Sequence, residues 1–304
     1  MRRIIPIILA VVLLFSGCSK KDAVTYDLIV CDSELTTLSE YLGTFSSENC
    51  KVENIQFVQE QIDLILDSVK KSDDTVNSIT LYGENISEDQ AVQFIKFAEK
   101  RNIPVIFSFA EISNEILESY DKAYSVHTDY INAAEITAEK ITDLWRENII
   151  IDEDRNYIFK FAVIKDENIT ADMQNYLDTL LYCMELYGIP MQLTETIDSA
   201  DITSVSDLEA IKDENEGIIA VSDIILPLLS EYSVDGDGVE IITLSHNSKN
   251  IYSENSAILN CLIDYTQYTD ASSHIIENYN QRQYLLENFP YLYVNKTIYI
   301  PATV

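Results

Sequence analysis

Short apolar runs alternate with longer amphipathic stretches along most of this chain, and this alternation limits the possible folds most strongly. The runs have the length of buried strands, and the stretches between them carry apolar residues at helical spacing. Predicted strands span 26–31, 51–57, 76–81, 104–109, 123–126, 157–164, 191–196, 217–221, 241–244 and an extended tail at 291–300. Predicted helices span 36–46, 59–71, 87–101, 132–145, 170–187 and 205–215. This order predicts an α/β protein with parallel sheets covered by helices on both faces.

The length and the composition support the same fold class. With 304 residues the chain is long for one core, so we expect two domains of similar α/β type. Only 7 Gly and 6 Pro interrupt it, which argues against a loop-rich β sandwich.

The chain is strongly acidic, with 51 Asp and Glu against 20 Lys and Arg and a net charge of −31. Such a chain repels phosphate backbones and anionic membrane surfaces. We therefore expect a soluble acidic surface and no nucleic-acid partner.

The N-terminus carries a targeting signal. Arg2 and Arg3 precede an apolar run at 4–15, and Ser16 and Gly17 lie directly before Cys18. This pattern resembles a lipoprotein signal peptide at 1–18, in which Cys18 is lipidated and becomes the mature N-terminus. We expect a linker at 19–25 and a domain anchored to the cell membrane on its extracytoplasmic side. An ordinary signal peptide or an uncleaved anchor is the alternative.

Four further cysteines do not form a metal-binding motif. No pair is spaced as C-x-x-C and no His lies nearby in sequence, so a zinc site is not expected. Export would permit a disulfide, for which Cys31 and Cys50 are the nearest pair, but buried free thiols are the default expectation.

A stretch in the middle of the chain resembles the galactose/glucose-binding proteins, which are type I periplasmic binding proteins of ABC sugar importers. The similarity is carried by SYDKAY at 119–124, by Thr128-Asp129 and Glu135-Ile136, and by the helix that contains Trp145. It includes polar residues at matching spacing, and weaker similarity extends over most of the chain from Tyr26 to Ile300.

The resemblance implies a two-lobed type I periplasmic-binding-protein fold, each lobe a parallel sheet flanked by helices. The implied N-lobe is 26–128 plus 261–288, and the implied C-lobe is 129–260 plus 289–304. It also implies a solute-binding protein that closes around a sugar or a related small polar molecule and then docks on an ABC permease. A non-transporting homologue, acting as a sensor or an interaction module, is the alternative, and in either case we expect a monomer.

The ligand-binding residues of that family are only partly kept. Phe109 and Ala110 stand where the family has Asn and Arg, and Tyr176 stands at the position of a second Arg. Asp172 is retained, whereas Ser222 replaces an amide. Our candidate ligand-binding residues are Glu34, Tyr82, Phe109, Asp172, Ser222, Ser245 and Asn260.

Different roles are expected for these candidates. Glu34, Asp172 and Asn260 would bind polar groups, and Phe109 would stack on the ligand or merely fill the space. Three possibilities remain open: a pocket for a less polar or different ligand, a monosaccharide pocket, or a site that has lost small-molecule binding.

The calcium loop of the family is also degenerate here. Asp152, Asp154 and Asn156 alternate, but the stretch is short, lacks a Gly and contains Arg155. We expect a solvated acidic loop and no cofactor, with bound calcium as the alternative.

Nothing in the sequence indicates an enzyme. His127, His246 and His274 lie far apart, and no phosphate loop, G-x-S-x-G or H-E-x-x-H motif is present. His127 and His246 are possible ligand contacts, because they lie near a predicted lobe crossover and a predicted strand end.

Overall fold

A computed structural model describes residues 25–32, 51–57, 75–83, 86–110, 112–150, 152, 155–222, 225–229, 231–232, 239–246, 257–278 and 292–304. The chain divides into two compact units, residues 1–125 with 274–285 and residues 126–273 with 286–304.

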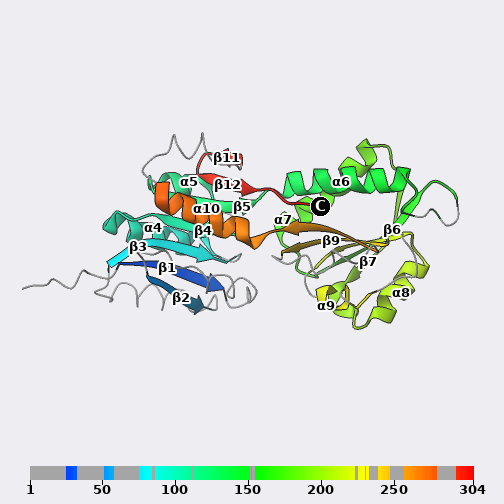
Figure 1. The fold of residues 1–304 in the computed structure, drawn as a ribbon, viewed down its shortest axis with the longest axis horizontal. Helices are drawn as coiled ribbons and strands as arrows, with labels where there is room; N and C mark the ends of the chain where they lie inside the picture. The colour runs from blue at the N-terminus through cyan, green and yellow to red at the C-terminus, as the bar shows by residue number, and fades with distance from the viewer. Residues whose placement is uncertain are drawn as a thin grey trace, which may run out of the picture. The chain divides into compact units, whose positions relative to one another are not determined.

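One sheet has seven strands in the order β11-β12-β5-β4-β3-β1-β2 (Figure 1). Strand β1 pairs with both β2 and β3, and β3 pairs with β4, all in parallel, whereas β11 and β12 pair antiparallel. The strands are β1 Thr25–Asp32, β2 Lys51–Phe57, β3 Thr75–Tyr82, β4 Val105–Ser108, β5 Ala123–Thr128, β11 Leu292–Val294 and β12 Thr297–Ile300.

The helix α4, Glu88–Arg101, shows why the local sequence folds as it does. Ser87 and Gln90 form a capping box, in which each side chain accepts a hydrogen bond from the backbone amide of the other residue. The apolar face of this helix, which includes Phe94 and Ile95, is buried in the core of the first unit. A short helix, α5 at Asn114–Glu118, also belongs to this unit.

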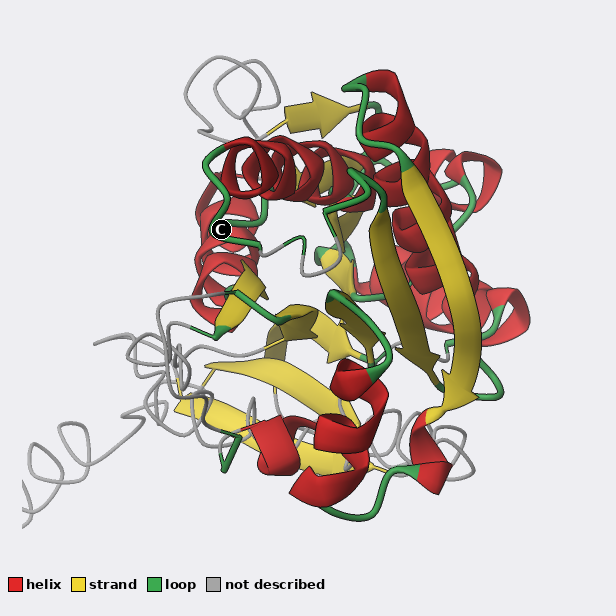
Figure 2. Cartoon of the chain, turned by 90° about the vertical axis from the view of Figure 1, so that its right-hand side faces the viewer, coloured by secondary structure: helices red, strands yellow, loops and turns green. Residues whose placement is uncertain are grey.

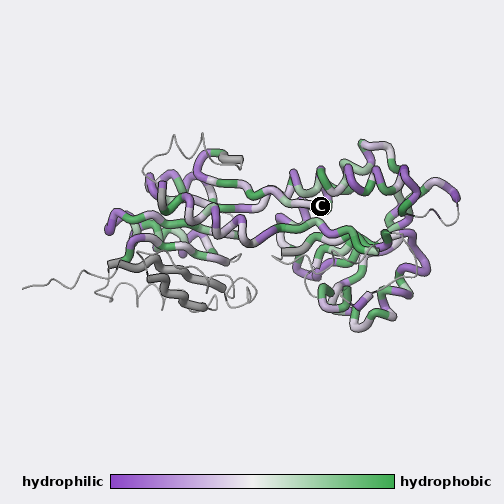
Figure 3. The backbone as a smooth tube through the Cα atoms, viewed as in Figure 1, coloured by the Kyte–Doolittle hydropathy of each residue, from purple (hydrophilic) through white to green (hydrophobic). Residues whose placement is uncertain are grey.

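The second sheet has five strands in the order β10-β9-β8-β6-β7, and all its pairings are parallel. In Figure 3 the central strands of this sheet are coloured mostly as hydrophobic, as expected for strands covered on both faces. The strands are β6 Phe159–Lys165, β7 Met191–Asp198, β8 Gly217–Val221, β9 Ile241–His246 and β10 Ile258–Ile263.

Helices lie on both sides of this sheet, with α6 on one side and α8 and α9 on the other (Figures 1 and 2). Asp129 caps α6 by accepting a hydrogen bond from the amide of Asn132 at 3.0 Å. The elements are α6 Tyr130–Arg146, α7 Ala171–Leu186, the 3₁₀ helix η2 Ser199–Asp201, α8 Val205–Asp213, α9 Leu226–Leu229 and α10 Tyr265–Asn278, of which α10 crosses the boundary between the units.

Strand β7 is the edge strand of the five-stranded sheet, and it is unusually exposed. Residues 192–196 are exposed on both faces of the strand. Leu193 retains 48% of its accessible surface, although Thr194 donates a hydrogen bond to the carbonyl of Phe161.

The predicted α/β class and the described strands are confirmed, with small shifts at their ends. The predicted strand 104–109 is shorter, because β4 ends at Ser108 and Phe109 leaves the strand conformation. Helices α5 and α9, the 3₁₀ helix η2 and strand β10 were not predicted, no range was predicted for helix α10, and the extended tail predicted at 291–300 forms the antiparallel strands β11 and β12. The predicted linker at 19–25 overlaps β1 at Thr25, and its other residues lie outside the described residues. The predicted helices at 36–46 and 59–71, the signal peptide with Cys18, and Cys50 also lie outside the described residues.

Within the described part of the chain, no helix combines the length and the apolar character needed to cross a membrane. The two cysteines whose side chains are described, Cys183 and Cys261, are buried free thiols.

Candidate ligand-binding site

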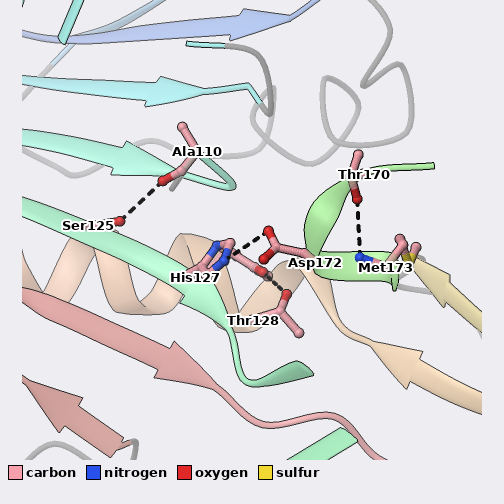
Figure 4. A network of polar contacts seen from close by, with 8 residues as sticks. Ala110, Ser125, His127, Thr128, Thr170, Asp172 and Met173 are labelled. Atoms are coloured by element: carbon pink, nitrogen blue, oxygen red, sulfur yellow. Dashed lines mark hydrogen bonds and ion pairs between the residues drawn. The ribbon is translucent and has the colours of Figure 1, made fainter. Parts of the chain in front are cut away.

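Two aromatic side chains lie at the carboxyl ends of β3 and β4 in the first unit. Tyr82 pairs with Ser108 in register, and the amide of Gly83 donates a hydrogen bond to the carbonyl of Ser108 at 3.1 Å. The rings of Tyr82 and Phe109 lie 6.2 Å apart at 50°, and both side chains are buried. Ala110 is also buried, and its carbonyl accepts a hydrogen bond from the hydroxyl of Ser125 (Figure 4). The carboxyl ends of β3 and β4 therefore bring together two aromatic rings, of which the ring of Tyr82 carries a hydroxyl.

Phe109 has an unusual backbone conformation, with φ at 73°. Bulky residues with a Cβ seldom adopt this left-handed region, which costs roughly 1–2 kcal/mol. Its ring is only 7% exposed, so packing against Tyr82 and its surroundings offsets that strain. Strain of this kind at a strand end is typical of a functional loop.

The carboxyl ends of β8, β6 and β7 in the second unit are polar. Lys165 of β6 pairs with Val221 of β8 and with Asp198 of β7. The next residue on each strand is therefore at the same level of the sheet, and these residues are Asp166, Ser222 and Ser199. The hydroxyls of Ser199 and Ser222 both donate to Oδ1 of Asp166. Three neighbouring strand ends thus form one hydrogen-bonded group, which we call the Asp166 cluster.

Burial differs within the Asp166 cluster. Ser199 and Ser222 are fully buried, whereas Asp166 is half-buried. Asp166 therefore keeps part of its surface exposed, whereas the two serines that bond to it do not. Carboxyl ends of parallel strands are the usual place for ligands in α/β sheets.

A second polar contact joins β5 to the start of α7. Nε2 of His127 lies 3.2 Å from Oδ2 of Asp172 (Figure 4). The imidazole is buried, its ring lies edge-on to Tyr130 and Tyr299, and its Nδ1 has no hydrogen-bond partner among the described residues. A proton on Nδ1 would be a buried donor without an acceptor, so the tautomer with hydrogen on Nε2 is favoured. Two candidates from the sequence, His127 and Asp172, therefore lie together.

Tyr176, which follows Asp172 by one helical turn, is buried in the core. Its hydroxyl donates to Thr137 at 3.3 Å, and Cys261 lies nearby. Burial raises the pKa of Tyr176 well above its ordinary value and raises the pKa of Cys261 to about 11. The residue that replaces a family Arg therefore has a packing role here.

The other sequence candidates occupy separate positions. Asn260 lies within β10 opposite Thr243, and Ser245 lies in β9 opposite Leu262. Glu34 lies outside the described residues. Trp145 lies beside Phe159 with ring centroids 5.5 Å apart, which is a packing contact.

In the acidic loop at 152–157, side-chain oxygens accept hydrogen bonds from backbone amides. Asp152 accepts hydrogen bonds from the amides of Asn156 and Tyr157, and Asn156 accepts one from Ile158. Asp154 lies outside the described residues. Among the described side chains, no group of three or more His, Cys, Asp or Glu is placed to hold a metal ion.

Sequence reasoning missed Asp166 and Ser199. Asp166 directly follows the apolar run of β6, and Ser199 directly follows β7. The strand-end position was the available signal, but the comparison with the galactose-binding pattern drew attention to Asp172 and Ser222 instead.

Comparison with known proteins gives similarity at the level of the fold. No protein-family profile matches the chain. The solved structures that resemble it include the glucose-galactose binding protein GanP from Geobacillus stearothermophilus, with 12% identity, 91% of this chain and 96% of that chain covered, and a TM-score of 0.56.

Two further structures show a similar degree of likeness. One is an ABC transporter solute-binding protein from Burkholderia graminis C4D1M in complex with D-arabinose, with 15% identity, 93% and 95% coverage, and a TM-score of 0.56. The other is described as a LacI transcriptional regulator from Bacteroides fragilis, with 10% identity, 91% and 96% coverage, and a TM-score of 0.56. With its two helix-flanked sheets, the chain therefore has the fold of the type I periplasmic binding proteins.

Proposed function

We propose that this protein is a membrane-anchored extracytoplasmic solute-binding protein that captures a small polar molecule, sugar-like in size, for an ABC-type importer. It acts by binding and carries out no chemical reaction. The observation that carries the proposal is the Asp166 cluster, which places a supported carboxylate at the sheet edge where this fold class binds ligands. The similarity to sugar-binding proteins of ABC transporters supports the same function.

The residues at the strand ends of the first unit affect which kind of ligand we propose. A sugar hydroxyl needs a hydrogen-bond partner when it is buried, and Phe109 and Ala110 supply none through their side chains. The aromatic pair of Tyr82 and Phe109 suits an apolar or less hydroxylated part of a ligand. A pocket lined by these residues would therefore favour a less hydroxylated ligand over a fully hydroxylated monosaccharide.

A thermal-shift screen of the full chain in detergent micelles tests small-molecule binding. Sugars, polyols, nucleosides and small amines are added one at a time, and unfolding is followed by intrinsic fluorescence. A ligand that binds only the folded state raises the midpoint. If no compound raises it, small-molecule capture is contradicted, and unchanged midpoints with galactose and glucose alone would exclude only the monosaccharide pocket.

The anchor is tested separately through Cys18. Replacing Cys18 with Ala removes the sulfur that would carry the lipid, so we expect the protein to move from the membrane fraction to the medium or the soluble extract. Metabolic labelling with a fatty acid should mark the unaltered chain and leave the variant unlabelled. Equal membrane retention of both proteins would support an uncleaved anchor instead.

A non-transporting sensor or interaction module is the second candidate. The replacement of the Asn and Arg of the sugar-binding pattern by Phe109 and Ala110 favours it, and the fold is also used by a protein described as a transcriptional regulator. Deleting the gene distinguishes the two functions once a ligand is known. Import predicts slower uptake of that ligand, whereas sensing predicts unchanged uptake and an altered transcriptional response.

A further inference from the structure

We infer that the Asp166 cluster selects solutes that carry a protonated amine. This inference rests on the proposed function and deepens it by naming a ligand class. It comes from the hydrogen-bond arrangement of the cluster, which leaves an acceptor available to a ligand.

Both hydroxyl hydrogens of the Asp166 cluster are already used in hydrogen bonds within the cluster. Ser199 and Ser222 each donate their hydroxyl hydrogen to Oδ1 of Asp166. A hydroxyl has one hydrogen to donate, so neither serine can give that hydrogen to a ligand at the same time. Both serines bond to Oδ1. Among the described residues Oδ2 of Asp166 forms no hydrogen bond or ion pair, and an ionised carboxylate oxygen only accepts hydrogen bonds. The ligand group that fits best must therefore be a donor.

The charge of the cluster favours a cationic donor over a neutral hydroxyl. No described Lys or Arg forms an ion pair with Asp166, and the neighbouring Lys165 directs its amine to Gln174 at 3.1 Å. An ammonium group supplies three donors and the missing positive charge. Hydrogen bonds between charged partners are roughly twice as strong as neutral ones.

The cluster is also built to hold the carboxylate in one position. The buried serines approach Asp166 from η2 and from the end of β8, so two separate segments fix its orientation. Fixing the acceptor before binding reduces the entropy that ligand binding would otherwise cost. The net charge of −31 further raises the local concentration of cations around the protein.

Matched pairs of compounds test the inference on the full chain in detergent micelles. The pairs are glucosamine with glucose, galactosamine with galactose, and putrescine with 1,4-butanediol, each measured by calorimetry and by thermal shift. We expect at least one amine to bind about tenfold more tightly than its neutral partner. We also expect its affinity to fall as sodium chloride is raised from about 50 to about 500 mM.

The outcomes separate this inference from the proposed function. If neutral members bind as well as the amines or better, the amine inference is overturned and solute capture stands. If no member of any pair binds, the amine inference is overturned, and the broader screen then decides whether solute capture survives.

The variant Asp166→Asn locates the effect in the cluster. It keeps the size of the side chain but removes the charge, so the affinity for the amine should fall about tenfold or more while any binding of the neutral partner is retained. Asp178→Asn is the matched control, because Asp178 is an exposed carboxylate on α7 of the same unit that accepts a hydrogen bond from Gln174. An equal loss in both variants, or no loss in Asp166→Asn at an unchanged melting midpoint, would contradict the assignment.

Discussion

The strand ends of the two units differ in chemistry although both follow parallel strands. In the first unit, β3 and β4 end at a buried aromatic pair, Tyr82 and Phe109. In the second unit, β8, β6 and β7 end at a carboxylate held by two serine hydroxyls. The carboxyl ends of parallel strands are thus aromatic in one unit and polar in the other.

The fold and the chemistry of the strand ends are therefore specified by different residues. The buried strands determine where the carboxyl ends lie. The residues at these ends and directly after them determine whether the ends are polar. The carboxylate of the second unit suits polar recognition, whereas the aromatic pair of the first unit suits apolar contact. Substitutions in each unit test this difference.

Replacing Phe109 with Ala should lower the free energy of unfolding by about 3 kcal/mol, because a buried ring is lost. Replacing it with Gly should cost roughly 1 kcal/mol less than Ala, because Gly adopts the left-handed conformation at φ 73° without strain. Chemical denaturation followed by circular dichroism measures both variants.

Substitutions of Phe107 provide the control for the relative stability of the Gly and Ala variants at Phe109. It is a fully buried residue of β4 with an ordinary strand conformation, so Gly should be worse than Ala there by about 1 kcal/mol. The same order at both positions would mean that the backbone strain at Phe109 has no energetic weight.

Alkaline pH should weaken the second unit through Cys261. Burial raises the pKa of this thiol from 9.0 to about 11, so the folded state keeps its proton where the unfolded state loses it. The stabilisation is therefore complete below pH 9 and is lost as pH rises towards and through 11, amounting to roughly 2–3 kcal/mol. Fluorescence of Trp145, the single Trp and a residue of this unit, follows the transition.

The variant Cys261→Ala should flatten this pH dependence between 9 and 11. Some slope will persist, because burial also raises the pKa of Tyr176 and of Cys183. An unchanged slope in the variant would show that Cys261 is not the titrating group.

The smallest effect is expected from the serines of the Asp166 cluster. Ser199→Ala and Ser222→Ala should each lower the free energy of unfolding by about 1 kcal/mol, the usual value of one hydrogen bond. Because both hydroxyls share one oxygen, the double variant should depart from the sum by about 0.5 kcal/mol or more. Ser119→Ala, at an exposed position, is the control and should stay within about 0.5 kcal/mol of the unaltered protein.

Much of the fold could be predicted from the sequence because its signals are local. Ala91, Phe94, Ile95 and Ala98 lie at helical spacing and Ser87 is a residue type that caps helices, so the local sequence specifies α4. Strand β10 was missed although its run ILNCLI carries apolar residues on both sides of Asn260.

The site was harder to predict because it depends on the registration of distant strands. The contact between Asp166 and Ser222 joins residues 56 positions apart, and it requires β6 to pair with β8 in one register. Likewise, the left-handed backbone of Phe109 follows from tertiary packing, since a Phe has no local preference for it. The rule that ligands bind at the carboxyl ends of parallel strands identifies such positions in the sequence. It does not identify which residues form hydrogen bonds with one another there.

The open edge of β7 has a consequence for handling this protein. Among the described strands, β7 pairs only with β6, and Leu193 is exposed, so this edge can accept a strand of another chain, which is a common start of sheet-to-sheet aggregation. Mutual repulsion between highly negative molecules opposes that association, and dissolved salt screens the repulsion. Concentrated stocks should therefore stay clear in dilute buffer and become turbid as ionic strength rises.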